Sequence, residues 1–400
     1  MDMRQSIFVF LMIVLTIVLI ISIFLFLTSS SGRQPLWTQS TVFGFDNFGT
    51  ATYEDGILYA PSKGNNKVYA LDAAIGAMVW SADVRQCDAS PCIDDDRVYV
   101  GECFSPDRTP TPQPKAIALN KTNGNQIWSF TEPENRAWVG SPVASGDFVY
   151  FTTFGSGVYA LNRTNGNPIW NRADIGEVIC SVAYHNGLIF VSAHNPPGQY
   201  ALNATTGEDL WHIDIGASWD TSPVIYDGMI IQTVSNTTTG STYNAREWST
   251  YVLNETTGAT IRVFQGKGSP STPLVHGGKI FIPSKADRQM WAYDLETGEE
   301  LWHTTSLRGD NAHAVSYCSP AGAGGTIYYQ TYTGVFYAIS EARGEILWTA
   351  SLGGLGFGSP SIGNGSVFIT NDASLYAFKI DYETGDWPMF CQNKLHQSHI

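Results

Sequence analysis

The residues that could form a binding site stand just before a series of short apolar stretches. They combine both charge signs with aromatic rings, and they are Arg85, Arg136, Trp138, Glu177, Trp219, Asp220, Lys267 and His313. Concave sites in which a few polar groups converge commonly bind small molecules. The set would suit a polar small molecule or a peptide, with Asp220 as the candidate catalytic residue. The alternative is a group of solvated loop residues with no special role.

The cysteines give a second set of chemically interesting residues. If Asp95-Asp96 forms a hairpin turn, Cys87 and Cys103 lie almost opposite each other, and a disulfide needs Cα atoms about 4.4–6.8 Å apart. We therefore predict a Cys87–Cys103 disulfide. Cys92 stands too far along the same strand to pair with Cys87. Cys180 and Cys318 are expected to be buried thiols at equivalent places, and Cys391 stays unassigned. The sequence has no EF-hand loop and no zinc-spaced Cys/His cluster, so it predicts no metal site.

The elements that must position these residues are copies of one phrase, clearest at residues 158–170. A strand-like alternation leads into a polar turn closed by Gly, and Trp follows four residues later. The pairs are Gly76/Trp80, Gly124/Trp128, Gly166/Trp170, Gly207/Trp211, Gly298/Trp302 and Gly344/Trp348, while Gly258 is followed by Arg262. Self-similarity at a period in the forties indicates an array of equivalent units.

A second signal in each unit is a tight turn between apolar strands. These turns are Asp55-Gly56, Asp95-Asp96, Gly146-Asp147, Asn186-Gly187, Asp227-Gly228, Gly277-Gly278, residues 322–325 and Asn364-Gly365. Such dipeptides are the strongest short-range signal for a hairpin. Eight hairpins, each followed by the repeated phrase, predict an all-β protein: an eight-bladed β-propeller of four-stranded blades.

The eighth unit lacks its last strand, and residues 36–39 match the missing piece. We predict that this N-terminal strand completes blade eight and closes the ring. The tryptophans that begin the outer strands are expected to dock against the next blade: Trp37, Trp80, Trp128, Trp170, Trp211, Trp302 and Trp348.

An apolar run precedes the repeats. Residues 7–27 are interrupted only by Thr16 and Ser22, which is long enough to span the roughly 30 Å hydrocarbon core of a bilayer as one transmembrane helix. Since signal peptides have shorter apolar stretches, an uncleaved anchor is favoured over a cleaved one. The predicted organisation is an anchor over 1–28, a tether over 29–35, the propeller over 36–384 and a tail over 385–400.

Six Asn-X-Ser/Thr triplets are compatible with glycosylation outside the cytoplasm. They begin at Asn120, Asn162, Asn203, Asn236, Asn254 and Asn364. Four of these Asn residues occupy the repeat turn, where Asn also stabilises the turn. The need for Asn in the turn therefore explains much of the number of triplets without glycosylation. Anchor, disulfide and triplets together predict an extracytoplasmic propeller. The formal net charge of −14 disfavours nucleic acid as a partner.

The phrase at residues 200–211, with Ser222-Pro223-Val224 after it, resembles the quinoprotein-type (PQQ-like) repeat. The resemblance covers residues 36–378 and implies the eight-bladed group that includes PQQ-dependent alcohol dehydrogenases and the non-enzymatic BamB-type assembly scaffold. Residues 386–390, with His396, are similar to a segment found beside such repeats in prokaryotic surface proteins.

For the dehydrogenases the resemblance implies a disulfide between adjacent cysteines, a Ca²⁺ held by acidic and amide ligands, and a catalytic Asp. This chain has no Cys-Cys pair and has shorter insertions between blades. We therefore expect a membrane-anchored, extracytoplasmic binding or assembly scaffold without catalysis or cofactor, whose partner is a protein or another envelope component. One alternative is a PQQ- and Ca²⁺-dependent oxidoreductase that uses an axial funnel, formed at the centre of the ring by the eight candidate residues named first. The other is a structural component of the cell envelope.

Overall fold

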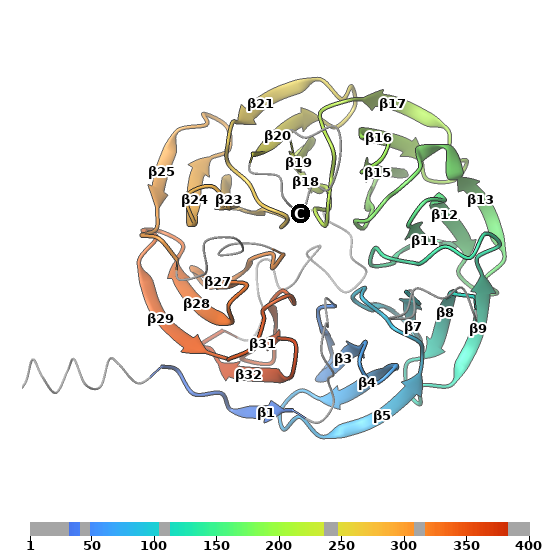
Figure 1. Ribbon diagram of the computed structural model, residues 1–400, viewed down its shortest axis with the longest axis horizontal. Coiled ribbons are helices and arrows are strands. Elements are labelled where there is room, and N and C mark those ends of the chain that lie inside the picture. The colour runs from blue at the N-terminus through green and yellow to red at the C-terminus, as the bar shows by residue number, and fades with distance from the viewer. Residues whose placement is uncertain (1–31, 41–48, 104–112, 236–246, 308–316, 383–400) are drawn as a thin grey trace, which may run out of the picture.

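The computed structural model describes residues 32–40, 49–103, 113–235, 247–307 and 317–382. Their strands form eight four-stranded antiparallel sheets arranged as blades around a central axis (Figure 1). The all-β, eight-bladed propeller with four strands per blade is thus confirmed. One short 3-10 helix, η1 (Ala173–Ile175), interrupts the strands between blades three and four.

In seven blades the strands follow the chain from the axis outward, and in the eighth the N-terminal strand takes the outermost place. We number the blades from the first complete one. Blade one is β2 (Thr52–Glu54), β3 (Ile57–Ser62), β4 (Lys67–Asp72) and β5 (Met78–Asp83); blade two is β6 (Cys92–Asp94), β7 (Arg97–Gly101), β8 (Lys115–Asn120) and β9 (Gln126–Thr131); blade three is β10 (Val143–Ser145), β11 (Phe148–Thr153), β12 (Gly157–Asn162) and β13 (Pro168–Arg172); blade four is β14 (Ala183–His185), β15 (Leu188–Ala193), β16 (Gly198–Asn203) and β17 (Asp209–Ile213).

The second half of the ring repeats this order. Blade five is β18 (Val224–Tyr226), β19 (Met229–Ser235), β20 (Trp248–Asn254) and β21 (Thr260–Phe264); blade six is β22 (Leu274–His276), β23 (Lys279–Ser284), β24 (Gln289–Asp294) and β25 (Glu300–His303); blade seven is β26 (Ala321–Ala323), β27 (Thr326–Gln330), β28 (Val335–Ser340) and β29 (Ile346–Ser351); blade eight is β30 (Ser361–Gly363), β31 (Ser366–Thr370), β32 (Leu375–Lys379) and β1 (Trp37–Gln39).

The ring closes as predicted, with the N-terminal strand in the last blade. β1 pairs antiparallel with β32, and Trp37 lies opposite Ala377. The backbone N–H of Leu36 donates to the carbonyl oxygen of Ala377 at 2.7 Å. Blade eight is therefore built from the two ends of the described chain.

The turns between the first two strands of each blade follow from their residue types. Asn186 and Gly187 have φ angles of 47° and 80°, so both central residues are left-handed. Gly and Asn reach this region most easily, and two-residue turns of this kind match the twist of the flanking strands. The short hairpin fixes the register and thereby sends alternate side chains to the two faces of the blade.

The hydrophobic core lies between neighbouring blades. One cluster joins Tyr59 and Val68 of blade one to Ile93, Val98 and other apolar side chains of blade two, nearly all of them buried. Each blade therefore contributes both of its faces to the core, and no blade buries its apolar surface alone.

The repeated Trp and Gly form the contact between blades. The Nε1–H of Trp128 donates to the carbonyl oxygen of Arg163 at 3.0 Å, and the indole ring covers Gly166 in the same turn. Six of the seven predicted tryptophans make this pair of contacts: Trp37, Trp80, Trp128, Trp170, Trp211 and Trp302. In blade five Arg262 replaces Trp, and its guanidinium donates to the carbonyl oxygen of Glu296 and covers Gly298.

Trp348 differs because, among the described residues, no turn glycine lies against its ring. Its ring packs against Phe378, with centroids 5.8 Å apart. The guanidinium of Arg33 lies 5.6 Å from the ring centroid. In the part of the chain that the structure describes, Arg33 just before β1 thus contacts the ring of Trp348, where the other docking tryptophans contact a turn glycine.

The predicted Cys87–Cys103 disulfide is not formed, since both residues are free, buried thiols. The Sγ–H of Cys87 lies 3.3 Å from the carbonyl oxygen of Ala89, and that of Cys103 lies 3.1 Å from the carbonyl oxygen of Trp138. The prediction assumed that the ladder extends back to Cys87. In the structure β6 begins at Cys92, so Cys87 lies outside the ladder. The segment before β6 still contacts Cys103, whose backbone N–H donates to the carbonyl oxygen of Gln86 at 2.5 Å, but the two thiols are not bonded to each other.

The predicted transmembrane helix over residues 7–27 and the tail over 385–400 lie outside the described residues. In the part of the chain that the structure does describe, no helix is both long and apolar enough to cross a membrane.

Candidate functional site

A ring of hydroxyl groups surrounds the axis of the propeller. In each blade one Ser or Thr stands just before the first strand, and its side-chain oxygen accepts a hydrogen bond from the backbone N–H of the equivalent residue in the preceding blade. The eight bonds measure 2.8 to 3.1 Å and form a closed circle through Thr50, Ser90, Ser141, Ser181, Ser222, Thr272, Ser319 and Ser359.

The ring explains the Ser-Pro pattern of the sequence. Ser90, Ser141 and Ser222 are each followed by Pro, which has no N–H to donate. The backbone N–H of the Ser is therefore the last one before the first strand of the blade that lacks a partner within its own segment. It donates a hydrogen bond to the hydroxyl oxygen of the ring residue in the next blade. Because buried backbone donors must be paired, this position tolerates Ser or Thr and little else.

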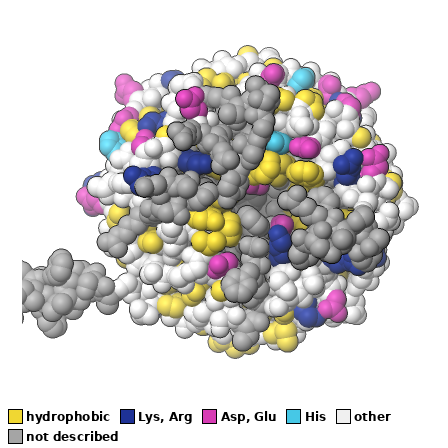
Figure 2. Space-filling model, viewed as in Figure 1, with side chains coloured by type: hydrophobic (Ala, Val, Ile, Leu, Met, Phe, Trp, Pro, Cys, Tyr) yellow, Lys and Arg dark blue, Asp and Glu magenta, His cyan; other side chains and the backbone are white. Residues whose placement is uncertain are grey.

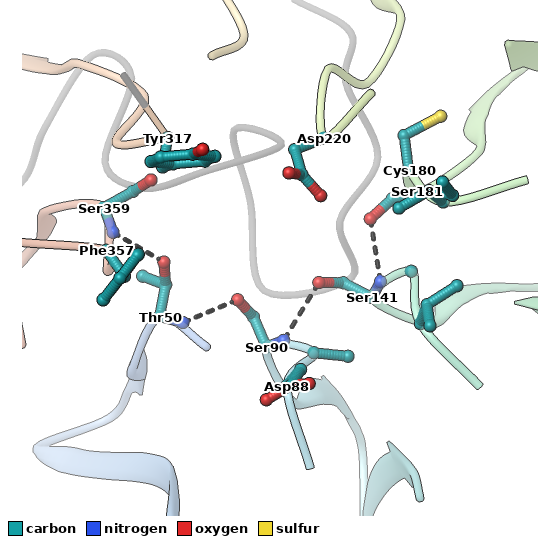
Figure 3. Close-up of a pocket in the computed structure, with 14 residues that line it drawn as sticks. Thr50, Asp88, Ser90, Ser141, Cys180, Ser181, Asp220, Tyr317, Phe357 and Ser359 are labelled. Carbon is teal, nitrogen blue, oxygen red and sulfur yellow. Dashed lines mark hydrogen bonds between the residues drawn. The ribbon is translucent and has the colours of Figure 1, made fainter. Parts of the chain in front are cut away.

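The ring residues of five blades border a cavity on the axis, with a volume of about 80 Å³. Side chains that reach it include the carboxylates of Asp88 and Asp220 and the rings of Tyr317 and Phe357. Figure 3 shows Asp220 on one side of the cavity and Tyr317 on the other, with Asp88 below the hydroxyl ring. The volume is well below the roughly 300–1,000 Å³ of pockets for drug-sized ligands.

Asp220 has the most unusual ionisation in this cavity. Burial, together with the negative charge of Asp88, raises the pKa of the Asp220 carboxyl from 3.8 to about 7, although a hydrogen bond from Trp219 opposes the shift. Its backbone is also left-handed, with φ of 58°, which is uncommon for a residue other than Gly. A carboxyl poised near neutral pH can give or take a proton, and such groups cluster at functional sites.

Among the predicted funnel residues that the structure describes, Asp220 alone lines the cavity. Trp219 lies beside it but packs edge-on against His194, with ring centroids 4.7 Å apart. Trp138 was predicted to face the funnel, and this is wrong. It is fully buried inside the blades, where its ring contacts Phe151 and Tyr159.

The remaining charged candidates are held away from the axis. The ammonium of Lys267 lies 2.7 Å from a carboxylate oxygen of Asp287 and 3.4 Å from the centroid of the Trp291 ring. Arg136 lies 3.7 Å from Glu134 and does not line the cavity.

Backbone contacts account for the last candidates. Glu177 forms isolated bridges with Phe154 and Asn195. The backbone N–H of Arg85 donates to Glu102 at 3.1 Å. Neither residue lines the cavity, and His313 lies outside the described residues. The structure therefore does not assemble the predicted set into one site.

Six of the residues that line the cavity share one position in the repeat, two residues before the ring hydroxyl. They are Asp88, Val139, Ile179, Asp220, Tyr317 and Phe357. Asp88, Tyr317 and Phe357 were missed from the sequence. Counting back two residues from each Ser-Pro pair would have identified all three, because successive side chains of an extended segment point in opposite directions.

The cavity does not fit PQQ. That cofactor is a flat tricyclic quinone with three carboxylates, whereas the described cavity wall carries two carboxylates and no Lys or Arg. Like charges in a small, partly dry site repel. Ca²⁺ takes six to eight oxygen ligands, and the described residues contain no group of three His, Cys, Asp or Glu placed to hold a metal ion.

The Asn residues of the repeat turns have a structural role. The Oδ1 of Asn203 accepts hydrogen bonds from the backbone N–H groups of Thr205 and Thr206 at 2.9 and 3.0 Å. Asn120, Asn162 and Asn254 make the same turn, and Asp72 and Asp294 replace Asn elsewhere. These hydrogen bonds involve only the Oδ1 atom of Asn. A glycan would attach to the Nδ2 atom of the same side chain, which does not take part in them. Asn364 lies exposed in a hairpin turn, and Asn236 is outside the described residues.

The comparisons with known proteins agree with this fold. The family described as outer membrane protein assembly factor BamB matches residues 28–194, 200–321 and 313–388. A tetrathionate hydrolase of Acidithiobacillus ferrooxidans is 26% identical over 358 residues, which cover 79% of this chain and 69% of that protein.

Two solved structures illustrate how widely the fold is shared. BamB from Moraxella catarrhalis has a TM-score of 0.68 at 17% identity, covering 87% of this chain and 100% of that one. A europium-containing methanol dehydrogenase also has a TM-score of 0.68, at 14% identity, covering 87% of this chain and 93% of that one. At these identities the likeness shows the fold alone. Because the family match spans most of the sequence, the chain belongs to the PQQ-like repeat family described as outer membrane protein assembly factor BamB.

Proposed function

We propose that the protein is a non-catalytic binding or assembly scaffold, anchored by residues 7–27 with its propeller outside the cytoplasm. The observation that carries this proposal is the rim. In every blade the residue just before the docking position is a large aliphatic side chain that is 40 to 55% exposed. These eight residues, the rim girdle, are Leu36, Val79, Ile127, Ile169, Leu210, Ile261, Leu301 and Leu347.

The rim girdle lies on or beside the outermost strands, which are the edges of the sheets. An edge strand has unpaired backbone N–H and C=O groups, and a partner segment can add to it as a further strand. The exposed aliphatic side chains supply apolar contacts at the same place. A rim built in this way favours a protein partner over a small-molecule ligand.

The charge distribution also disfavours nucleic acid. Figure 2 shows acidic and basic side chains scattered in small groups over one face of the propeller. Among the described side chains on that face, no continuous basic surface is visible. A nucleic-acid site needs such a surface to neutralise phosphates.

An extracytoplasmic location would expose the Asn side chains to glycosylation. Asn203 and Asn364 are the most accessible of the candidates that the structure describes. Treatment of the natively expressed protein with an endoglycosidase tests this location. A downward mass shift that is lost when Asn203 and Asn364 are both changed to Gln supports it.

The scaffold function is tested by photocrosslinking the full chain in its own cell envelope. A photoreactive amino acid replaces Leu210 or Leu301 in the rim girdle, and Asp209 or Glu300 next to them serve as matched polar controls. We expect one discrete adduct of a second protein from the girdle positions only. An adduct with another copy of this chain would instead favour a structural envelope component.

The enzyme alternative is tested on the same preparation. Purified full-length protein is titrated with PQQ and Ca²⁺ and assayed with alcohols and an electron-accepting dye. Saturable cofactor binding, with dye reduction that is lost in Asp220→Ala, would overturn the scaffold proposal.

A second candidate function is hydrolysis of a sulfur oxyanion. It is favoured by the raised pKa of Asp220 and by the similarity to a tetrathionate hydrolase. A dianion enters a cavity with two carboxylates more easily when Asp220 is protonated, which happens as the pH falls below about 7. Tetrathionate turnover that rises toward acidic pH and disappears in Asp220→Asn would support this candidate.

A further inference from the structure

The exposed apolar side chains of the rim are concentrated where blades eight and one meet. Five of them, which we call the junction patch, are Leu36, Ile75, Met78, Val79 and Tyr382, and Ile75 and Met78 are 68% and 60% exposed. The side chains of blade eight and blade one are in contact here. Trp37 donates to the carbonyl oxygen of Ala73 at 3.1 Å, and Gln39 donates to that of Gly76 at 3.3 Å.

A groove of about 470 Å³ lies beside the junction patch. Leu36, Ala74, Ile380 and Tyr382 contribute apolar surface to its wall. Leu36 and Tyr382 belong to both the patch and the groove, whose wall also carries the polar side chains of Asn364, Ser366, Lys379 and Asp381. Clusters of exposed apolar side chains rimmed by polar residues commonly mark contact with a protein or a membrane.

The other repeats show that this surface is not required by the fold. At the place of Ile75, just before the turn glycine, the other repeats have Asn123, Asn165, Thr206, Thr257, Thr297 and Arg343. At the place of Met78, two residues before the docking position, they have Gln126, Pro168, Asp209, Thr260, Glu300 and Ile346. Blade one alone has large apolar residues at both places next to the end of the tether.

The chain enters the propeller at this same place. Gly32 and Arg33 run along the outer strand of blade seven, where the Arg33 N–H donates to the carbonyl oxygen of Thr349 at 2.9 Å. Four residues lie between Leu27, the end of the apolar run, and Gly32, so the two are five residue steps apart. An extended chain covers at most about 3.3–3.6 Å per residue, so this rim lies within roughly 18 Å of the end of the anchor.

From these observations we infer that the junction patch rests on the membrane that holds the anchor. This inference depends on the anchor of the proposed function. The propeller then stands on its rim, with Leu36, Met78 and Val79 at the lipid surface and the axis parallel to the bilayer. Apolar side chains enter the interfacial layer of a bilayer, while the exposed Arg33 and Lys379 at the same rim lie at the level of the lipid phosphates.

This orientation determines which surfaces of the propeller face the solvent. Both faces of the propeller, and with them the axial cavity, stay open to solvent. The opposite rim, in blades four and five, is the part farthest from the lipid (Figure 1). That rim presents Leu210 and Ile261 to partners that approach from outside.

The inference is tested with the full chain reconstituted in phosphatidylcholine nanodiscs. In a Cys391→Ser background the five remaining cysteines are buried. Val79→Cys, or Ile261→Cys as the matched control at the same repeat position on the opposite blade, carries an environment-sensitive fluorophore. The two native side chains are 54% and 52% exposed. We expect a spin-labelled lipid to quench the fluorophore at position 79 at least about twofold more strongly than at 261.

A second variant distinguishes quenching that depends on the junction patch from quenching that depends only on the tether. Ile75→Asn with Met78→Gln installs the residues that blade two has at these places, so the fold should tolerate both. The lipid quenching at position 79 should fall toward that at 261, while the thermal midpoint stays unchanged. Equal quenching at both positions in the parent chain would overturn the inference. So would protection of position 79 from both the lipid quencher and an aqueous one.

Alkaline carbonate extraction distinguishes this inference from the proposed function. A chain that is released from membranes by carbonate has no anchor, and then the proposed placement itself fails. A chain that stays in the membrane but shows equal quenching at both positions keeps its anchor and loses only the docked rim.

Discussion

The contact between Trp128 and Gly166 predicts a measurable difference between two glycine-to-alanine substitutions. Gly166 has φ of 74°, and a Cβ added there would lie 2.5 Å from Cε3 of Trp128. Gly187 has φ of 80°, and a Cβ added there has nothing within 4 Å. The two positions share the same backbone strain and differ in the contact with the neighbouring blade.

The expected magnitudes follow from these two effects. A left-handed conformation costs an L-residue about 1–2 kcal/mol, and both substitutions carry this cost. At Gly166 the indole must also move, which adds about 1–3 kcal/mol of overpacking and weakens the hydrogen bond to the carbonyl oxygen of Arg163. Gly166→Ala should therefore be less stable than Gly187→Ala by about 1–3 kcal/mol.

Urea unfolding, followed by circular dichroism, measures both variants against the parent. A second pair, Trp128→Ala with and without Gly166→Ala, completes a double-mutant cycle. Without the indole, the cost of Gly166→Ala should fall to that of Gly187→Ala. Equal costs at Gly166 and Gly187 in the parent would refute the view that indole docking joins the blades.

Three further perturbations address the axis and the thiols. Ser141→Ala leaves the buried N–H of Ser90 without its acceptor and should cost about 1–3 kcal/mol in thermal unfolding, while Ser141→Thr, a residue that two blades already use, should cost little. The pKa of the Asp220 carboxyl is raised from 3.8 to about 7, so between these pH values the folded protein holds a proton that the unfolded chain has lost. The stability of the fold should therefore fall as the pH rises through that window. Thermal midpoints taken from pH 4 to 8 measure this slope, and Asp220→Asn should flatten it. Burial raises the pKa of the Cys87 thiol to about 12, and the other described thiols are buried too. In a Cys391→Ser background a thiol reagent should therefore not react with the native protein. The same reagent should detect five thiols after denaturation without a reductant. Three thiols would mean that a disulfide forms.

The architecture was predictable because its signals repeat. Most blades show a tight turn of Gly, Asn or Asp and the Gly and Trp of the repeated phrase, so the neighbours of an ambiguous unit identify it. Even the exchange of the last strand could be predicted, since residues 36–39 match a strand that the eighth unit lacks, and β1 lies there. Local turn chemistry and side-chain alternation are enough to specify strands of this kind.

The axial site was less predictable because the crossing segments have no repeating turn to fix their register. Trp138 stands three residues before Ser141 and packs inside the blades, whereas Asp220 stands two residues before Ser222 and faces the cavity. A shift of one residue reverses the direction of a side chain in an extended segment. The reference point is the hydroxyl ring, which becomes visible only when the eight blades are assembled.

Closure of the ring by β1 also constrains how the protein is made. The Arg33 guanidinium donates to the carbonyl oxygen of Lys379, 346 residues later, so the first strand waits for almost the whole chain to be synthesised. Until then Leu58 and Leu71 of blade one have no blade eight to pack against, although both are fully buried in the finished ring. Non-local pairing of this kind is slow and leaves apolar edges uncovered. A nascent chain of this protein therefore keeps the apolar face of blade one exposed until its last blade has been synthesised, and loss of β32 would leave β1 without the strand with which it pairs.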